Sequence, residues 1–210
     1  MRPHIFILLA ILFTTSIFAQ IRFEAGYYID NQGKRQECLI RNLGWNNNPR
    51  EIEYRMTAED QTVAKTIDEI TEFGIGNNIK YVRADVDLDR SSEMLQSRTK
   101  FKEPVFTNER LLLKVIFQSK NTLYSYYESG LQRYYYKSGD KILPLIHKAY
   151  TSIATPENKQ EYPEETRYNN TFRVQLWKDI KCPNTNMKRV EKVEYNEKSL
   201  LTYFREINNC

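Results

Sequence analysis

Hydrophobic and polar residues alternate most clearly between Lys80 and Asp89. On an extended chain, one face of this segment is apolar and the other is mostly charged: Val82, Ala84, Val86 and Leu88 against Tyr81, Arg83, Asp85, Asp87 and Asp89. A period of two is typical of a strand that buries one face. We therefore expect a β-sheet with one side in water.

Further strands are expected on both sides of this segment. Asn31-Gln32-Gly33 is a turn-forming cluster between Arg22–Asp30 and Lys34–Leu43, which predicts a hairpin. Arg110–Gln118 is apolar at successive positions, as in a central strand covered on both faces. Shorter strands are expected around these segments: Glu51–Met56, Thr71–Ile75, Asn121–Glu128, Leu131–Lys137 and, at a sheet edge because of Pro144, Ile142–Tyr150.

Helical spacing appears only near the end of the chain. Phe172, Leu176 and Ile180 recur every four residues, which predicts an amphipathic helix over Thr171–Lys181, capped by Asn169 or Asn170. Two shorter helices are expected around 187–193 and after Asn196. The predicted fold class is α+β: a mainly antiparallel β domain over 20–150, a linker over 151–170 and a small C-terminal helical module over 171–210.

Residues 1–19 resemble a secretory signal peptide with a cut between Ala19 and Gln20. The alternative is an uncleaved membrane anchor, but the apolar run Ile5–Phe13 is shorter than the roughly 20 residues that a spanning helix needs. We therefore expect an exported protein that is periplasmic, outer-membrane associated or secreted, without a transmembrane segment after cleavage. Nucleic-acid and nicotinamide chemistry are not expected in that location.

Composition and cysteines refine this expectation. The chain has 31 basic and 27 acidic residues, a near-balance that argues against a dedicated polyanion binder. Cys182 and Cys210 bracket the helical module, so we expect a disulfide between them, as exported proteins often contain. Cys38, in an apolar run, is expected to be buried and unreactive.

Candidate catalytic groups are few. Asp85, Asp87 and Asp89 share one strand face and could hold Ca²⁺, but side chains two positions apart on a strand are about 6 to 7 Å apart, so a solvated face is the simpler interpretation. His147 is the only histidine after the leader and is expected at the surface of an edge strand. No catalytic residue, metal site or cofactor is predicted.

The chain contains 15 tyrosines, and these are its most suggestive side chains for binding. They cluster on the hairpin expected over 121–137, where exposed rings could contact a glycan or an envelope protein, and where buried rings would stabilise strand pairing instead. Trp45 offers either a second contact or packing at the sheet edge. The candidate binding residues are therefore Trp45, Tyr124, Tyr126, Tyr134 and Tyr135.

Several short segments form a recognisable set that extends over nearly all of the chain after the leader. They include Gly26-Tyr27, Cys38-Leu39-Ile40, Asn48-Pro49, Lys80-Tyr81-Val82-Arg83, Leu111 to Val115, Tyr134-Tyr135-Tyr136, Gln175-Leu176, Cys182 and Asn208-Asn209-Cys210. Together these segments resemble a set of uncharacterised exported proteins of Gram-negative bacteria. The resemblance implies location and architecture, and in some relatives a similar strand-rich region precedes an outer-membrane β-barrel.

The function expected from the sequence is a non-catalytic binding or interaction module of the cell envelope, with an unidentified envelope protein or glycan as partner. One alternative is an envelope hydrolase that uses Asp85 and Asp87 as acid and base, which requires these carboxylates to line a concave pocket. The other is a structural assembly component, which requires a large exposed apolar patch on the sheet or the tail.

Overall fold

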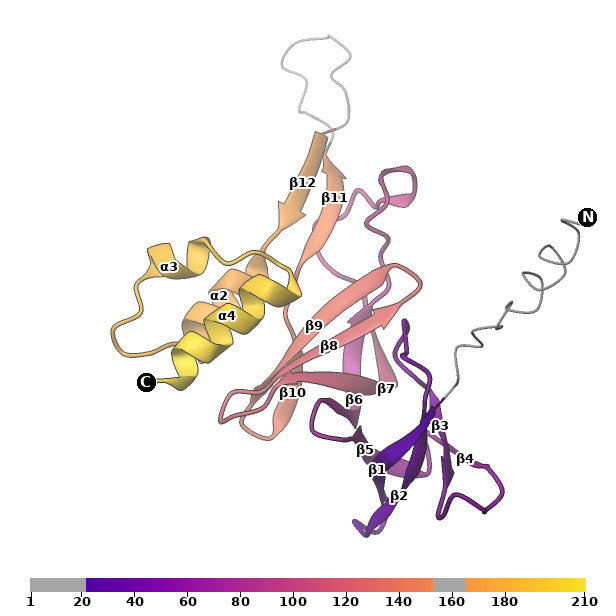
Figure 1. The fold of residues 1–210 in the computed structure, drawn as a ribbon. Coiled ribbons are helices and arrows are strands. Elements are labelled where there is room, and N and C mark those ends of the chain that lie inside the picture. Colours follow the sequence, from indigo (N-terminus) through magenta and orange to yellow (C-terminus); the bar gives the residue numbers. More distant parts are fainter. Residues whose placement is uncertain (1–21, 153–164) are drawn as a thin grey trace, which may run out of the picture.

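A ten-stranded antiparallel sheet followed by three helices forms most of the described part of the protein in a computed structural model (Figure 1). The structure describes residues 22–152 and 165–210, so the predicted leader lies outside the described residues. The predicted α+β class is confirmed. The strands are β1 (Arg22–Asp30), β2 (Arg35–Asn42), β3 (Glu51–Arg55), β4 (Val63–Thr66), β5 (Ile70–Ile75), β6 (Ile79–Asp89), β7 (Phe106–Phe117), β8 (Leu123–Glu128), β9 (Leu131–Ser138) and β10 (Lys141–Pro144).

The order of strands across the sheet is β10-β9-β8-β7-β6-β5-β1-β2-β3-β4. Two antiparallel meanders, β1–β4 and β5–β10, are therefore joined where β1 pairs with β5. The core of the first meander includes Ile40 and Ile52. Phe73 of β5, Tyr81 of β6 and Leu112 of β7 extend that core into the second meander. The β8–β9 hairpin turns through Ser129 and Gly130, with φ of 49° and 90°, which matches the turn that the sequence predicts there.

The second meander curls so that β10 comes to lie against β6. A separate core fills the inside of this curl and contains Leu111 and Leu113 of β7, whereas Leu112 between them belongs to the core of the first meander. The uninterrupted apolar run of β7 is explained by this arrangement, because its two faces pack against different cores. The prediction of a strand covered on both sides is confirmed.

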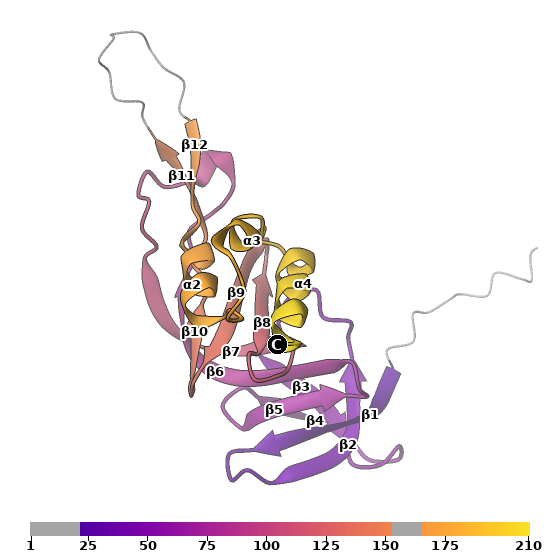
Figure 2. The ribbon, with the colours of Figure 1, turned by 90° about the vertical axis from the view of Figure 1, so that its left-hand side faces the viewer.

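Helices α2 (Thr171–Asp179), α3 (Met187–Glu191) and α4 (Glu197–Asn208) cover the outer face of β8 and β9 (Figure 2). Their apolar residues share one core with Leu123, Tyr134 and Tyr136 of the hairpin. The predicted cap of α4 is confirmed, because the Asn196 side chain accepts a hydrogen bond from the Ser199 N–H. The Cys182–Cys210 disulfide is also present and ties the end of α4 to the segment after α2.

Two features of the chain depart from the sequence predictions. The strand expected over Ile142–Tyr150 is two strands, because the chain leaves β9 soon after Pro144, which has no N–H to donate. The second part, β11 (Lys148–Ser152), pairs with β12 (Glu165–Asn169) in a separate two-stranded sheet. β12 and the four-residue β4 are not predicted by the sequence pattern.

The Asn46–Pro49 turn links the two meanders by hydrogen bonds that the sequence does not predict. β7 pairs with β8 only from Lys114 to Phe117. On the N-terminal side of Lys114 the two strands are no longer paired, and the Asn46–Pro49 turn lies between them. The Asn48 amide donates to the carbonyl oxygens of Leu112 and Ser125, and its oxygen accepts from the Tyr127 N–H. The first meander is thereby hydrogen-bonded to the middle of the second.

Candidate functional site

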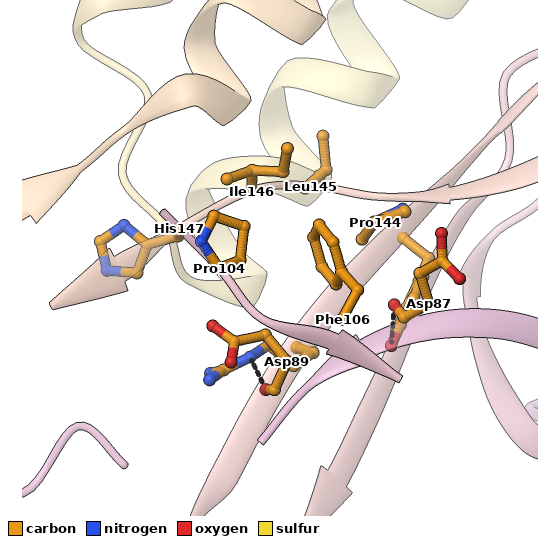
Figure 3. A pocket seen from close by; sticks show the side chains of 10 residues that line it. Asp87, Asp89, Pro104, Phe106, Pro144, Leu145, Ile146 and His147 are labelled. Carbon is orange, nitrogen blue, oxygen red and sulfur yellow. Dashed lines mark hydrogen bonds between the residues drawn. The ribbon is translucent and has the colours of Figure 1, made fainter. Parts of the chain in front are cut away.

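A small cavity forms where the end of β6 meets β9 and the chain that follows β10 (Figure 3). Its free volume of about 10 Å³ is close to what one water molecule needs. Four residues that the sequence singles out, Asp87, Asp89, Tyr135 and His147, come together in its lining. The other lining residues are Pro104, Phe106, Arg133, Pro144, Leu145 and Ile146.

Asp89 is buried beside this cavity, contrary to the prediction that it belongs to a solvated face. One carboxylate oxygen, Oδ1, accepts hydrogen bonds from the N–H and the hydroxyl of Ser91. The other, Oδ2, has no hydrogen-bond partner among the described residues and lies 3.9 Å from Nζ of Lys148. Both side chains are at most 5% exposed. An opposite charge is what makes burial of the carboxylate tolerable.

Arg133 is the third buried charge in this region. Its guanidinium donates to the carbonyl oxygens of Asp89 and Ser91 and also pairs with the Glu93 carboxylate at 2.9 Å. These bonds fix the direction in which the chain leaves β6. Sequence reasoning missed Arg133 and Lys148, because a charged residue in a short strand is ordinarily exposed.

The segment from residue 98 to 106 is fastened to the small sheet by polar groups of β11 and β12. Lys148 donates from Nζ to the carbonyl oxygen of Glu103 at 2.7 Å, and Asn169 donates from its amide to that of Lys102. The Thr151 N–H donates to the carbonyl oxygen of Thr99. Figures 1 and 2 both show this segment beside β11 and β12, at the opposite end of the molecule from β1–β4.

Apolar side chains of this region point into water. Phe101 is 74% exposed, Val105 is 70% exposed and Tyr168 on β12 is 54% exposed. Charged residues next to them in the chain are exposed as well. We call this region the end surface and define it by Phe101, Val105 and Tyr168, together with the charged residues Lys100, Lys102, Glu103 and Arg167.

The predicted tyrosine surface is not exposed. Tyr124, Tyr126, Tyr134 and Tyr135 are at most 6% exposed, because the curl of the second meander covers one face of β8 and β9 and the helices cover the other. Trp45 is half-buried, with its ring edge-on to Phe73. These placements favour the packing alternative for all five residues, because a contact role needs exposed rings.

The two carboxylates of the hydrolase alternative, Asp85 and Asp87, lie in different surroundings. Asp87 lines the cavity, whereas Asp85 is exposed and pairs with Arg110 at 2.9 Å. The hydrogen bond from Arg110 lowers the pKa of Asp85. A general acid requires a raised pKa, so the environment of Asp85 opposes that role.

The sequence predicted that His147 lies at the surface of an edge strand, and the structure contradicts this. Its ring is half-buried, stacks on Tyr195 with centroids 4.4 Å apart, and bonds through Nδ1 to the Asn170 side chain at 2.9 Å. Burial lowers the pKa of His147. The neutral ring therefore acts as a packing residue between β11 and the helices.

A second hollow, with a free volume of about 220 Å³, lies on the sheet where β5 to β9 come together. Its lining is polar and includes Glu72, Lys80, Thr122, Tyr124 and Lys137. Glu72 is already engaged, since it pairs with Lys80 at 3.0 Å and accepts the Tyr27 hydroxyl at 2.7 Å. Because the Glu72 carboxylate already has these two partners, its place in the hollow does not indicate a ligand.

Within residues 22–152 and 165–210, no three or more His, Cys, Asp or Glu side chains cluster in a way that could hold a metal ion. No helix in the same ranges has the length and apolar character needed to cross a membrane. Comparison with protein-family models, curated proteins and solved structures finds no match to this chain.

Proposed function

We propose that the protein is an exported, non-catalytic binding module of the cell envelope and that the end surface is its contact site. The observation that carries this proposal is the combination of exposed apolar side chains with a backbone held by buried polar groups. Exposed apolar residues that gather in one place mark interaction sites in soluble proteins.

The anchoring of this segment supports a binding role. Lys148 and Asn169 are buried, and both donate to backbone carbonyl oxygens of the segment that carries Phe101. A loop that is ordered before its partner arrives loses less conformational entropy on binding. The hydrogen bonds from Lys148 and Asn169 therefore lower the conformational entropy that the end surface loses when it binds a partner.

Export remains part of the proposal and has two supports. The sequence of residues 1–19 has the pattern of a signal peptide, and the Cys182–Cys210 disulfide is a bond that persists in oxidising compartments. N-terminal sequencing of protein from the native host should begin at Gln20. Recovery of intact Met1 from the cytoplasm would contradict export.

The contact site is tested by photocrosslinking in the native host. A photoreactive amino acid replaces Phe101 in one variant and Met56, which is 45% exposed in the first meander, in the control. We expect adducts at position 101 well above those at position 56. Equal adduct yields at both positions would refute the end surface as the contact site.

A further inference from the structure

We propose that the hollow where β5 to β9 come together binds a small sugar acid, a single sugar ring that carries one carboxylate. Its free volume of about 220 Å³ is below the roughly 300 to 1,000 Å³ of pockets that take drug-sized ligands. A ligand of one ring therefore suits its size. None of the residues that line the hollow belongs to the end surface, so this site goes beyond the proposed function.

The hollow lies at one end of the curl of the second meander, at the opposite end of β6 from the small cavity beside Asp89. Val82 of β6 and Val115 of β7 line it, and both are half-buried against the core inside the curl. Ligand sites are common at the mouths of β-barrels, and a curled sheet offers a similar concave surface. The two valines give the C–H groups of a sugar ring an apolar contact.

Two polar side chains of the lining are more than nine-tenths buried: Thr122 is 5% exposed and Tyr124 is 6% exposed. The Thr122 hydroxyl donates to the carbonyl oxygen of Ser119, so towards a ligand it is an acceptor. Burial raises the pKa of Tyr124, while a hydrogen bond with Thr122 lowers it in part. The phenol is therefore protonated at neutral pH and can donate. Sugar hydroxyls both donate and accept, and this lining offers partners for both roles.

The charges of the lining favour a ligand with one negative charge. Glu72 and Lys80 pair at 3.0 Å and offset each other. Lys137 is exposed, and within residues 22–152 and 165–210 its ammonium has no hydrogen-bond or ion-pair partner. Among the described residues that line the hollow, these three are the charged ones, so one positive charge is left without compensation. Hydrogen bonds from an ammonium to a carboxylate are stronger than those between neutral groups.

The Glu72–Lys80 pair can bind neighbouring hydroxyls of the same ring. The Tyr27 hydroxyl bonds to one oxygen of Glu72 and Lys80 pairs with the other. A carboxylate offers about four lone-pair sites and an ammonium has three donors, so both groups keep capacity for a ligand. A ring that places its carboxylate at Lys137 and its hydroxyls at this pair uses the polar lining on both sides of the hollow.

The test compares methyl β-glucuronide with methyl β-glucoside, which differ only in carrying a carboxylate or a hydroxymethyl group on one ring carbon. Isothermal titration calorimetry measures the binding of each to the whole chain from Gln20 onward. We expect the glucuronide to bind about tenfold or more tightly than the glucoside, because only the carboxylate forms a charge-assisted bond with Lys137. Equal affinities, or no binding of either glycoside, would overturn the proposal.

A competition experiment separates recognition of the ring from attraction of a charge. Acetate at the same concentration as methyl β-glucuronide should displace little of it, because acetate lacks the hydroxyls that the lining binds. Displacement by acetate as effective as by unlabelled glucuronide would show that the hollow takes any carboxylate, which would refute a sugar acid as its ligand.

Two pairs of variants assign the binding to this hollow. Lys137→Gln should remove the preference for the glucuronide, whereas Lys188→Gln, at an exposed lysine of α3, should keep it. Tyr124→Phe should weaken the binding of both glycosides about fivefold, because one hydrogen bond is lost. Tyr126→Phe is its control, since Tyr126 is buried on the same strand but does not line the hollow.

Equal effects in a variant and its control would show that the sugar binds elsewhere and would refute the assignment. Circular dichroism of each variant checks that the fold is retained, and the tyrosine variants keep the ring that packs in the core. The proposed function is tested separately, because photocrosslinking at position 101 probes the end surface. Either proposal can therefore fail while the other stands.

Discussion

Lys148 and Asp89 are the pair of side chains on which the anchoring of the end surface depends. Each is at most 5% exposed, and their charged atoms are 3.9 Å apart. The pair offsets the cost of burying each charge, and Lys148 also holds the carbonyl of Glu103. Removing one partner leaves the other as an uncompensated buried charge.

We therefore predict that Lys148→Met lowers the free energy of unfolding by about 3 to 5 kcal/mol. Adding Asp89→Asn to this variant should restore much of the loss, because no buried charge then remains unpaired. Arg35→Met is the matched control, since Arg35 pairs with Glu37 on the surface and should change stability by less than about 1 kcal/mol. Urea denaturation measures all three, and equal losses for Lys148→Met and the control would contradict the prediction.

A second residue-scale prediction concerns alkaline pH. Burial raises the pKa of Tyr81 from 10.0 to about 12 and that of the Cys38 thiol from 9.0 to about 11. Both groups are neutral when protonated, so the folded state holds its protons at higher pH than the unfolded state. The stability that these groups contribute is complete below pH 9 and is lost as pH rises toward 12.

The measurement is the free energy of unfolding between pH 8 and pH 12. Tyr81→Phe should make its decline with pH shallower, because the phenol no longer ionises in the unfolded state. Tyr127→Phe, at a tyrosine that is 37% exposed, is the control and should leave the slope unchanged. A decline of the same steepness in Tyr81→Phe would show that this phenol does not carry the effect.

At the scale of elements, the sheet depends on one turn as well as on strand pairing. β7 and β8 are splayed beyond Lys114, and the gap between them is closed by the Asn48 side chain, which contacts three backbone groups. An asparagine in a turn ordinarily bonds to its own neighbours. Here its partners lie more than 60 positions away in the chain.

Asn48→Ala should therefore lower the free energy of unfolding by about 3 kcal/mol, because each of three backbone groups loses a partner at about 1 kcal/mol or more. Asn47→Ala is the control, since the Asn47 side chain accepts one hydrogen bond, from Ser129. We expect about 1 kcal/mol there. Thermal and urea unfolding compare the two, and equal losses would contradict the bridging role of Asn48.

At the scale of the whole molecule, three cores pack against different faces of one curled sheet. Tyr134 and Tyr136 of β9 point into the core under the helices, while Tyr135 between them belongs to the core inside the curl. The C-terminal helices are therefore part of the packing of the sheet. The Cys182–Cys210 disulfide closes their far end.

Replacing both cysteines with serine should lower stability by about 3 to 4 kcal/mol according to the loop-entropy estimate for a separation of 28 residues. The helices should stay packed on β8 and β9, because that core is built from buried apolar residues. Amide hydrogen exchange of α4 and β9 measures this directly. Fast exchange throughout α4 at neutral pH would show that the disulfide, and not the core, holds the helix in place.

The sequence by itself determined most of the strands, the three helices, the cap at Asn196 and the disulfide. These features depend on local period, turn residues and chain position, which are all visible along the chain. Tertiary structure alone decided that Asp89, Arg133 and Lys148 are buried, that the hairpin tyrosines are covered on both faces, and that Phe101 is exposed on an anchored segment. The physical reason is that burial depends on how the sheet curls and on what packs against each face, and a pattern of period two states only that the two faces differ.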